Sequence, residues 1–246
     1  MKKLFASLGI VVLGLTGCSL PGAGAGDASS QLLAGASFAP LVRPAVCRGY
    51  VSLSIDDGPT RTSQELVDVL KNYQVPAIFF NTGENIEKFP RMVELERTVV
   101  GVQFGNHSYD HPDLSTLSPD LVRSQIERTK ALQGPGVNLF RPPYGSANAM
   151  VAQVMKNTGM VEVLWTHDSK DFSALSAEQI IDQAQGMKDG GIVLLHDRPL
   201  TAQALPSIIG SYYAKGFCFG KIVQSTKAQA PAESPDLTFF ARAVAP

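Results

Sequence analysis

Seven apolar runs in this chain have the length and composition of β-strands, and five of them end in side chains that bind metals or transfer protons. The five runs, each with the side chains that follow it, are 50–55 with Asp56 and Asp57, 100–104 with His107 and His111, 139–140 with Arg141, 161–165 with Asp168 and Asp171, and 192–195 with His196. If the strands are parallel, their C-terminal ends share one rim, where such folds carry their active sites. The pattern therefore predicts an enzyme.

Helical patterns separate these runs from one another and from the two remaining strand candidates, 77–80 and 217–223. Thr62 and Glu65 have the spacing of a capping box, and Ser118 with Pro119 matches the start of a later helix. Strands that alternate with helices predict right-handed crossovers and a parallel sheet. With seven strands rather than eight, we expect an α/β fold with a strained or incompletely closed barrel.

The composition favours one folded domain. The chain has 246 residues and is 44% hydrophobic, which suits a single core, and all-parallel barrels commonly reach this size as one domain. We expect a catalytic domain over residues 41–223 and a C-terminal tail over 224–246, whose apolar stretch 237–240 could dock on a surface. The 21 basic and 22 acidic residues give a net charge of -1, which indicates no nucleic-acid partner, and no protein partner is implied.

The first residues have the pattern of an export signal. Lys2 and Lys3 precede the apolar run 4–15, and Leu15-Thr16-Gly17-Cys18 resembles a bacterial lipobox, with cleavage before Cys18 and acylation of that residue. We expect a lipoprotein signal peptide over 1–17 and a flexible tether rich in Gly, Ala and Ser over 18–40. The alternative is an ordinary signal peptide that contains a cysteine. The prediction is an exported bacterial lipoprotein anchored in a membrane of the cell envelope. Ser19 stands where an aspartate would favour retention in the inner membrane, which favours the periplasmic side of the outer membrane.

Two cysteines remain if Cys18 is acylated. Cys47 lies just before the first strand candidate and Cys218 lies within the last. Neighbouring first and last strands in an oxidising compartment would bring the two together, so we hypothesise a disulfide bond. Two buried free thiols are the alternative.

Two histidines, His107 and His111, are spaced four residues apart. One helical turn would place both imidazoles on the same side, where they could bind one cation with a carboxylate as third ligand. Solvated histidines at this spacing are common, but three of the four histidines in the chain lie on the predicted rim. Asp56 and Asp57, followed by Gly58, offer two carboxylates that diverge at a strand end, in a sequence that also favours a turn.

Five segments between about residues 50 and 222 stand in a characteristic order and spacing: Ser54-Ile55-Asp56-Asp57-Gly58-Pro59, His107-Ser108-Tyr109-Asp110-His111, Arg141-Pro142-Pro143-Tyr144-Gly145, Asp168-Ser169-Lys170-Asp171-Phe172 and Leu194-Leu195-His196-Asp197. In these segments the chain resembles the NodB-type polysaccharide deacetylases, which form carbohydrate esterase family 4. Five ordered motifs are far more specific than any one of them. The resemblance implies a single NodB homology domain with a distorted (β/α)7 barrel.

The resemblance also implies a role for each residue of the site. Asp57, His107 and His111 would bind Zn2+, or another divalent transition metal such as Co2+. Asp56 would be the general base, with Arg141 paired to it. His196 would be the general acid, oriented by Asp171, and the backbone N–H of Tyr144 would bind the oxyanion. The substrate groove would include Trp165, Phe172 and Leu194, although Trp165 fits a core residue equally well.

The implied activity is metal-dependent hydrolysis of N-acetyl groups in glycans that contain N-acetylglucosamine, such as chitooligosaccharide, peptidoglycan or exopolysaccharide. A metal held by three protein ligands keeps a position open for the acetyl carbonyl, and an acid must protonate the departing amine. Two alternatives stay open: an O-acetyl esterase acting on acetylated xylan, and an inactive glycan-binding lipoprotein. Phe172 stands where the family usually has Trp, which implies a smaller aromatic wall and no indole N–H donor in the groove near His196.

Overall fold

The computed structural model describes residues 41–224 and 239–241, all of which belong to one compact unit, Ser37–Pro246. The predicted signal peptide, Cys18 and the tether lie outside the described residues, as does most of the tail. Among the residues that the structure describes, no helix combines the length and the hydrophobicity needed to span a bilayer.

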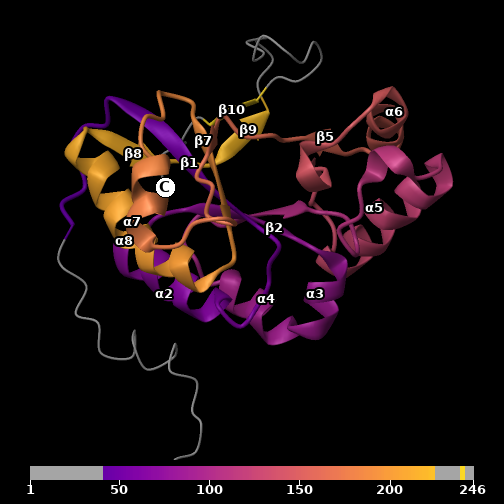
Figure 1. Cartoon of the computed structure of the whole chain (residues 1–246), viewed down its shortest axis with the longest axis horizontal. Helices are drawn as coiled ribbons and strands as arrows, with labels where there is room; N and C mark the ends of the chain where they lie inside the picture. Colours follow the sequence, from indigo (N-terminus) through magenta and orange to yellow (C-terminus); the bar gives the residue numbers. More distant parts are fainter. Residues whose placement is uncertain (1–40, 225–238, 242–246) are drawn as a thin grey trace, which may run out of the picture. The chain divides into compact units, whose positions relative to one another are not determined.

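Strands and helices alternate along most of the chain, as Figure 1 shows. In order, the elements are β1 Gly49–Asp56, α2 Ser63–Tyr73, β2 Ala77–Asn81, α3 Gly83–Lys88, α4 Pro90–Glu96, β3 Gln103–Asn106, the 3-10 turn η1 Leu114–Thr116, α5 Pro119–Gln133, β4 Leu139–Phe140, the 3-10 turn η2 Pro143–Gly145, α6 Ala149–Asn157, β5 Val161–Glu162, β6 His167–Asp168, α7 Ala177–Gln183, β7 Ile192–His196, α8 Pro199–Ala214, β8 Phe217–Phe219, β9 Ile222–Gln224 and β10 Phe239–Ala241.

The main sheet is parallel throughout. Its strands follow the order β5-β4-β3-β2-β1-β7-β6, and β8 pairs with the first residues of β1. The two ends of this order, β5 and β6, are not paired with each other, so the barrel is open between them. The expected fold class, a distorted and incompletely closed (β/α)7 barrel, is confirmed.

The alternation in β1 decides which residues reach the site. Val51, Leu53 and Ile55 belong to one core cluster together with buried side chains of α2 and α8. Because successive side chains in a strand point to opposite faces, Ser54 and Asp56 point the other way. The small side chain of Ser54 leaves room on that face for the buried side chain of Arg141, which directly follows β4.

Several strands have other bounds than the apolar runs predicted. Only the first two residues of the run 161–165 form a strand, β5, which pairs with β4. The next strand, β6, begins after the run and pairs with β7. The run 100–104 is shifted to β3, and the run 217–223 is divided into β8 and β9. The apolar character of these runs reports burial, which does not require a neighbouring strand. In the tail, β10 pairs with β9 in antiparallel fashion, so part of the apolar stretch 237–240 is docked there.

The helix starts were predicted with mixed success. Ser118 caps α5 by accepting a hydrogen bond from the Leu121 N–H, with Pro119 at the first helical position, as expected. The predicted capping box at α2 is wrong, because Thr62 has helical backbone angles and its side chain makes no capping hydrogen bond. The chain entering α2 is held instead by Asp197, which accepts from Thr60 N at 3.0 Å.

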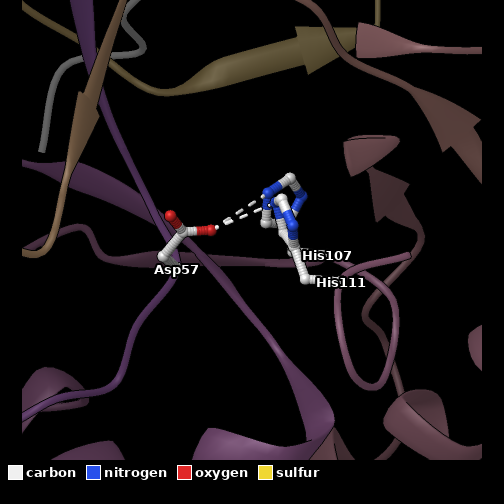
Figure 2. A group of neighbouring side chains, drawn as sticks. All are labelled: Asp57, His107 and His111. Atoms are coloured by element: carbon white, nitrogen blue, oxygen red, sulfur yellow. Dashed lines mark ion pairs between the residues drawn. The ribbon is translucent and has the colours of Figure 1, made fainter. Parts of the chain in front are cut away.

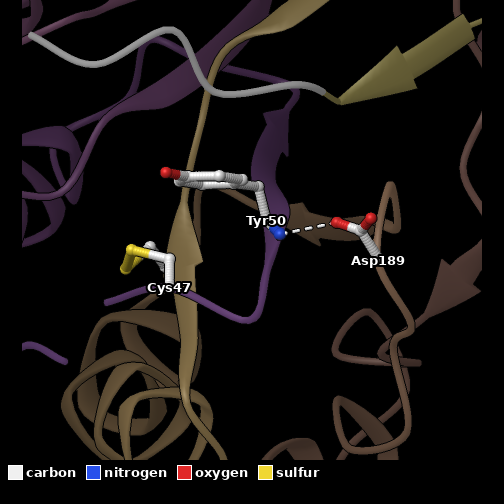
Figure 3. Close-up of a disulfide and its surroundings, with 4 residues drawn as sticks. Cys47, Tyr50 and Asp189 are labelled. Atoms are coloured by element: carbon white, nitrogen blue, oxygen red, sulfur yellow. Dashed lines mark hydrogen bonds between the residues drawn. A yellow bond between two sulfur atoms is a disulfide. The ribbon is translucent and has the colours of Figure 1, made fainter. Parts of the chain in front are cut away.

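Cys47 and Cys218 form a disulfide bond with their Cα atoms 5.5 Å apart (Figure 3). Cys218 lies in β8 opposite Tyr50 of β1, so strand pairing brings the two cysteines together. The Tyr50 N–H donates to Asp189 Oδ1 at 2.7 Å, which ties the start of β1 to the turn before β7. These contacts secure the N-terminal end of β1, the strand that carries the first two acids of the site at its other end.

Candidate metal centre and active site

Three side chains converge at the C-terminal ends of β1 and β3 (Figure 2). Asp57 Oδ1 lies 3.5 Å from His107 Nε2 and 3.3 Å from His111 Nε2. Asp57 directly follows β1 and has a left-handed backbone, with φ of 66°. This conformation is rare for a residue with a side chain and turns the Asp57 carboxylate toward the histidines, away from the direction it would take in a continued strand. The three donors could hold one metal ion.

The protonation of His107 tests whether these residues fit a cation. His107 Nδ1 lies 2.7 Å from the carbonyl oxygen of Arg141, which only accepts, so this nitrogen carries the hydrogen. In the neutral ring, the lone pair of Nε2 then points at the Asp57 carboxylate, and two acceptors face each other. Asp57 Oδ1 is buried and has no hydrogen-bond partner. A cation between the acceptors would satisfy all of them, so the residues fit a metal.

The electrostatics of the three residues suit the same interpretation. Burial acts to raise the pKa of Asp57, but the neighbouring imidazoles, His107 above all and then His196 and His111, lower it to about 2. Burial lowers the pKa of His111, and His107 lowers it further. A carboxylate and a neutral imidazole are the forms that bind metals.

The loop that presents the two histidines is not the helical turn we predicted. Ser108 and His111 both have left-handed backbones, with φ of 64° and 60°. Asn106 Oδ1 accepts from Ser108 N at 3.0 Å, and Ser108 Oγ accepts from His111 N at 3.1 Å. These side-chain bonds replace helical ones and fold the loop back, so that both rings reach Asp57.

Asp56 lies beside this group and is paired with Arg141. Arg141 is fully buried, and its Nη1 donates to Asp56 Oδ1 at 2.7 Å and to Ser54 Oγ at 2.9 Å. The other carboxylate oxygen, Asp56 Oδ2, lies 3.6 Å from His107 Nε2 and thus faces the metal-type site. The guanidinium neutralises the charge of the buried acid while leaving one oxygen directed at the site.

Arg141 also bonds the segment that joins β5 to β6. Its Nε donates to the Val163 carbonyl at 2.9 Å and its Nη2 to the Leu164 carbonyl at 3.2 Å, between β5 and β6. The guanidinium carbon lies 4.1 Å from the Phe80 ring centroid, a cation–π contact. Burial lowers the pKa of Arg141, opposed by the Asp56 carboxylate. One arginine therefore satisfies two backbone carbonyls and a site carboxylate at once.

His196, at the end of β7, is held by Asp171. His196 Nδ1 lies 2.6 Å from Asp171 Oδ1, and its backbone N–H donates to Asp171 Oδ2 at 2.7 Å. Thr201 Oγ1 also donates to Asp171 Oδ2, at 2.6 Å. Burial works against the charged ring, yet the hydrogen bond and charge of Asp171, with the charges of Asp56 and Asp57, raise the pKa of His196. These contacts favour the protonated imidazole, with Nδ1 directed at Asp171.

Two exposed aromatic rings flank the histidines. Tyr144 is 70% exposed, has φ of 60°, and its ring centroid lies 4.7 Å from that of His111. Phe172 is 50% exposed, and its ring centroid lies 5.9 Å from that of His196. Leu194 is buried in β7, two residues before His196. Trp165 is half-buried, and its ring lies near the Arg141 guanidinium. Of the predicted groove residues, Phe172 is thus the exposed one, Leu194 is buried, and Trp165 is half-buried and packs against the core cluster that contains Phe80.

Some residues that shape the site were not predicted. Asn85 Nδ2 donates to the Asp57 carbonyl at 2.8 Å, and Thr82 N donates to the Gly58 carbonyl at 3.0 Å, so the turn that bears Asp57 is held from β2 and α3. Thr201, on Asp171, was also missed. Of these, only Thr82 carried a usable signal, as a residue that could cap the helix after a strand.

The fold and the side chains define an α/β barrel with a two-histidine, one-aspartate metal-type site. Beside it lie an arginine-paired carboxylate, Asp56, and its partner on the neighbouring strand, the carboxylate-paired His196. The family model of polysaccharide deacetylases matches residues 44–163. A chitooligosaccharide deacetylase of Rhizobium leguminosarum bv. phaseoli is 32% identical over 70% of this chain and 84% of its own. The chain belongs to the polysaccharide deacetylases of carbohydrate esterase family 4.

Two further comparisons agree. A solved structure, the family 4 carbohydrate esterase from Streptomyces lividans in complex with acetate, has 35% identity and a TM-score of 0.68 over 72% of this chain and 94% of that one. The bifunctional xylanase/xylan deacetylase of Cellvibrio japonicus is 35% identical over 75% of this chain. The chain spans only 29% of the length of that relative, so the activity of the whole relative is not carried over.

Proposed function

We propose that this protein is a metal-dependent deacetylase that hydrolyses N-acetyl groups of glycans containing N-acetylglucosamine. The observation that carries the proposal is the position of Asp57, His107 and His111 beside Asp56, with His196 opposite Asp56 on the neighbouring strand. Asp56 has a buried cation on one side and a free oxygen toward the site, and His196 has a carboxylate on Nδ1. A base and an acid prepared in this way are what amide hydrolysis requires.

Each residue has a defined task. Asp56 Oδ2 accepts the proton of the attacking water, and Arg141 keeps that carboxylate oriented. A divalent metal on Asp57, His107 and His111 would supply Lewis-acid polarisation and a more acidic water. His196 Nε2 donates its proton to the leaving nitrogen, because without that proton the nitrogen would have to leave as an anion, which is a poor leaving group. The N–H of Tyr144, on its left-handed backbone, would donate to the carbonyl oxygen as negative charge develops there.

We propose zinc as the metal. Two imidazoles and one carboxylate are a common ligand set for catalytic zinc, with the fourth position left for water or substrate. Cobalt would bind in the same geometry. Elemental analysis of protein purified from its own host, without added metal, tests the assignment, and stoichiometric manganese or iron in place of zinc would contradict it.

An O-acetyl esterase is the second candidate, and the similarity to the Cellvibrio protein, named a xylan deacetylase, favours it. The two activities differ in the leaving atom, because an alkoxide depends less on proton donation than an amine does. The raised pKa of His196 favours the N-acetyl substrate. Acetate release from N-acetylglucosamine oligomers should exceed that from acetylated xylan, and the reverse order would select the esterase.

The same assay separates both enzymes from the third alternative, an inactive glycan-binding protein. Zinc-loaded parent protein and the variant Asp56→Asn are incubated with each glycan, and acetate is measured together with glycan binding. Release by the parent alone supports the enzyme. If both proteins bind a glycan and neither releases acetate, the result supports the inactive glycan-binding protein.

We further propose that the chain is exported and anchored to the cell envelope through acylated Cys18, with residues 18–40 as a tether that lets the domain reach acetylated glycans. The lipobox-like sequence supports this proposal. Metabolic labelling with an alkyne fatty acid should tag the parent protein and leave Cys18→Ala untagged. Equal labelling of both would rule out acylation at this residue.

A further inference from the structure

Gln125, on α5, makes three hydrogen bonds to the loop that carries the two histidines. Its Oε1 accepts from the backbone N–H of Tyr109 at 2.8 Å and from that of Asp110 at 3.2 Å. Its Nε2 donates to Asp110 Oδ1 at 2.8 Å. The residues it holds are the middle of the segment between His107 and His111, and Gln125 itself touches neither ring.

This segment needs outside support because its backbone is unfavourable. Both Ser108 and His111 are left-handed, and non-glycine residues persist in that region only where the surroundings determine them. Ser108 and Asn106 secure the two ends of the loop through hydrogen bonds within the loop itself. Gln125 is different, because it holds the loop from a separate element.

The element behind Gln125 is rigid. Val122 and Ile126 of α5 are fully buried, and both belong to the core cluster around Phe140. One turn further along α5, Thr129 Oγ1 donates to the Ser108 carbonyl at 2.8 Å. The helix therefore presents a fixed acceptor for two backbone N–H groups and a fixed donor for one side chain.

We propose that Gln125, together with Asp110, is a positioning residue of the metal site: it holds His111 at the distance from His107 and Asp57 that a metal requires. The inference rests on the proposed function only in that these three side chains bind a metal. Supporting contacts one step behind the ligands change metal affinity by about 10- to 100-fold when they are lost. Because Gln125 acts through the backbone, we expect the lower end, about 10-fold.

The pair with Asp110 allows a sharp test. In Gln125→Glu, one carboxylate oxygen can still accept from the two N–H groups, but the other meets Asp110 Oδ1, and two carboxylates repel each other. The double variant Asp110→Asn with Gln125→Glu restores a donor opposite an acceptor. The single variant Asp110→Asn completes the double-mutant cycle.

A matched control lies on α2, where Gln64 Nε2 donates to Asp68 Oδ1 at 2.9 Å. Gln64→Glu creates the same repulsion between exposed side chains on a helix, on an element that contributes no ligand. Any change in metal affinity that it causes measures the effect of added charge alone.

The experiment measures zinc affinity of the full chain by competition with a chromogenic chelator, with the visible spectrum of the cobalt form as a report on ligand geometry and thermal melting as a check on folding. We expect Gln125→Glu to bind zinc about 10-fold more weakly than the parent and to change the cobalt spectrum. The zinc affinity of the double variant should return to within about 2-fold of the parent, and that of Gln64→Glu should equal the parent's. Acetate release by the parent is measured in parallel. Zinc binding without acetate release would defeat the proposed function and leave this inference standing.

Two results would overturn the inference. One is a Gln125→Glu variant that binds zinc as tightly as the parent with the same cobalt spectrum. The other is a double variant that binds no better than Gln125→Glu, because the loss then does not come from the contact with Asp110. A parent that binds no zinc would defeat both the inference and the proposed function.

Discussion

His196 and Asp57 are both polar groups at the rim, but the protein supports them differently. Asp171 accepts three hydrogen bonds, from the ring and backbone of His196 and from Thr201, so the proton-donor side is complete within the chain. Asp57 Oδ1 is buried without a hydrogen-bond partner and faces two imidazole nitrogens. Folding alone therefore satisfies the polar groups of His196 and Asp171, whereas Asp57 Oδ1 is arranged for a ligand that the chain does not supply.

Removal of the metal from Asp57, His107 and His111 should have the largest effect on acetate release, and it should leave the contacts of His196 with Asp171 unchanged. After treatment with a chelator we expect acetate release to fall to the blank, and added zinc to restore it. Binding to the native state also stabilises it, by about 4 kcal/mol at a thousandfold excess over Kd, so the melting temperature should fall as well. Undiminished turnover in protein shown by elemental analysis to be metal-free would break the comparison.

Asp56→Asn comes next, because it removes the proton acceptor and leaves the metal ligands in place. A positioned acid or base contributes about 10²- to 10⁴-fold, and we expect kcat to fall by that factor while zinc affinity stays within a few fold. The variant also leaves buried Arg141 without its countercharge, which lowers stability by about 3–5 kcal/mol. Stopped acetate release with retained zinc titration would support the assignment, and parent-level kcat would remove Asp56 from its role.

Asp171→Asn should change the pH profile more than it changes binding. In the parent, Asp171 raises the pKa of His196, so the protonated acid persists to higher pH. Loss of this carboxylate should move the alkaline limb of kcat to lower pH. We expect zinc affinity to be unaffected, since Asp171 supports the other side of the site. An alkaline limb in the same place for both proteins would show that His196 is not the acid.

The smallest effect concerns stability. The pKa of His196 is raised above its ordinary 6.5 in the folded protein, so its ion pair contributes stability that is fully present below the unfolded pKa and is lost as pH rises through the folded pKa. The difference in unfolding free energy between parent and Asp171→Asn, from urea titrations, should shrink as pH increases above 6.5. A difference that grows with pH would contradict the sign of this linkage.

Much of the site could be predicted from the sequence because its motifs are local. Asp56 and Asp57 are adjacent, and parallel strands necessarily bring their C-terminal ends to one rim. The predicted helical turn at His107 and His111 failed for a physical reason: equal spacing also fits a loop with left-handed residues, and the hydrogen bonds of Asn106 and Ser108 that select the loop are not visible as a periodic pattern.

Supporting residues were harder to predict. Asn85, Thr201 and Gln125 are polar residues at helical positions, where a solvent-facing side chain is the ordinary expectation. Their importance arises from what they face after folding, a carbonyl of Asp57, a carboxylate oxygen of Asp171 and two N–H groups of the histidine loop. No local pattern encodes such pairings between segments far apart in the chain.

The sequence by itself determined the α/β barrel and the chemical types at the rim, because strand and helix periodicity and the residues after each strand are properties of short segments. Only the tertiary structure decided that Arg141 bonds the segment between β5 and β6 while holding Asp56, and that Asp57 Oδ1 is left to face two imidazoles. These outcomes depend on distances between distant segments, which packing sets and no single segment contains.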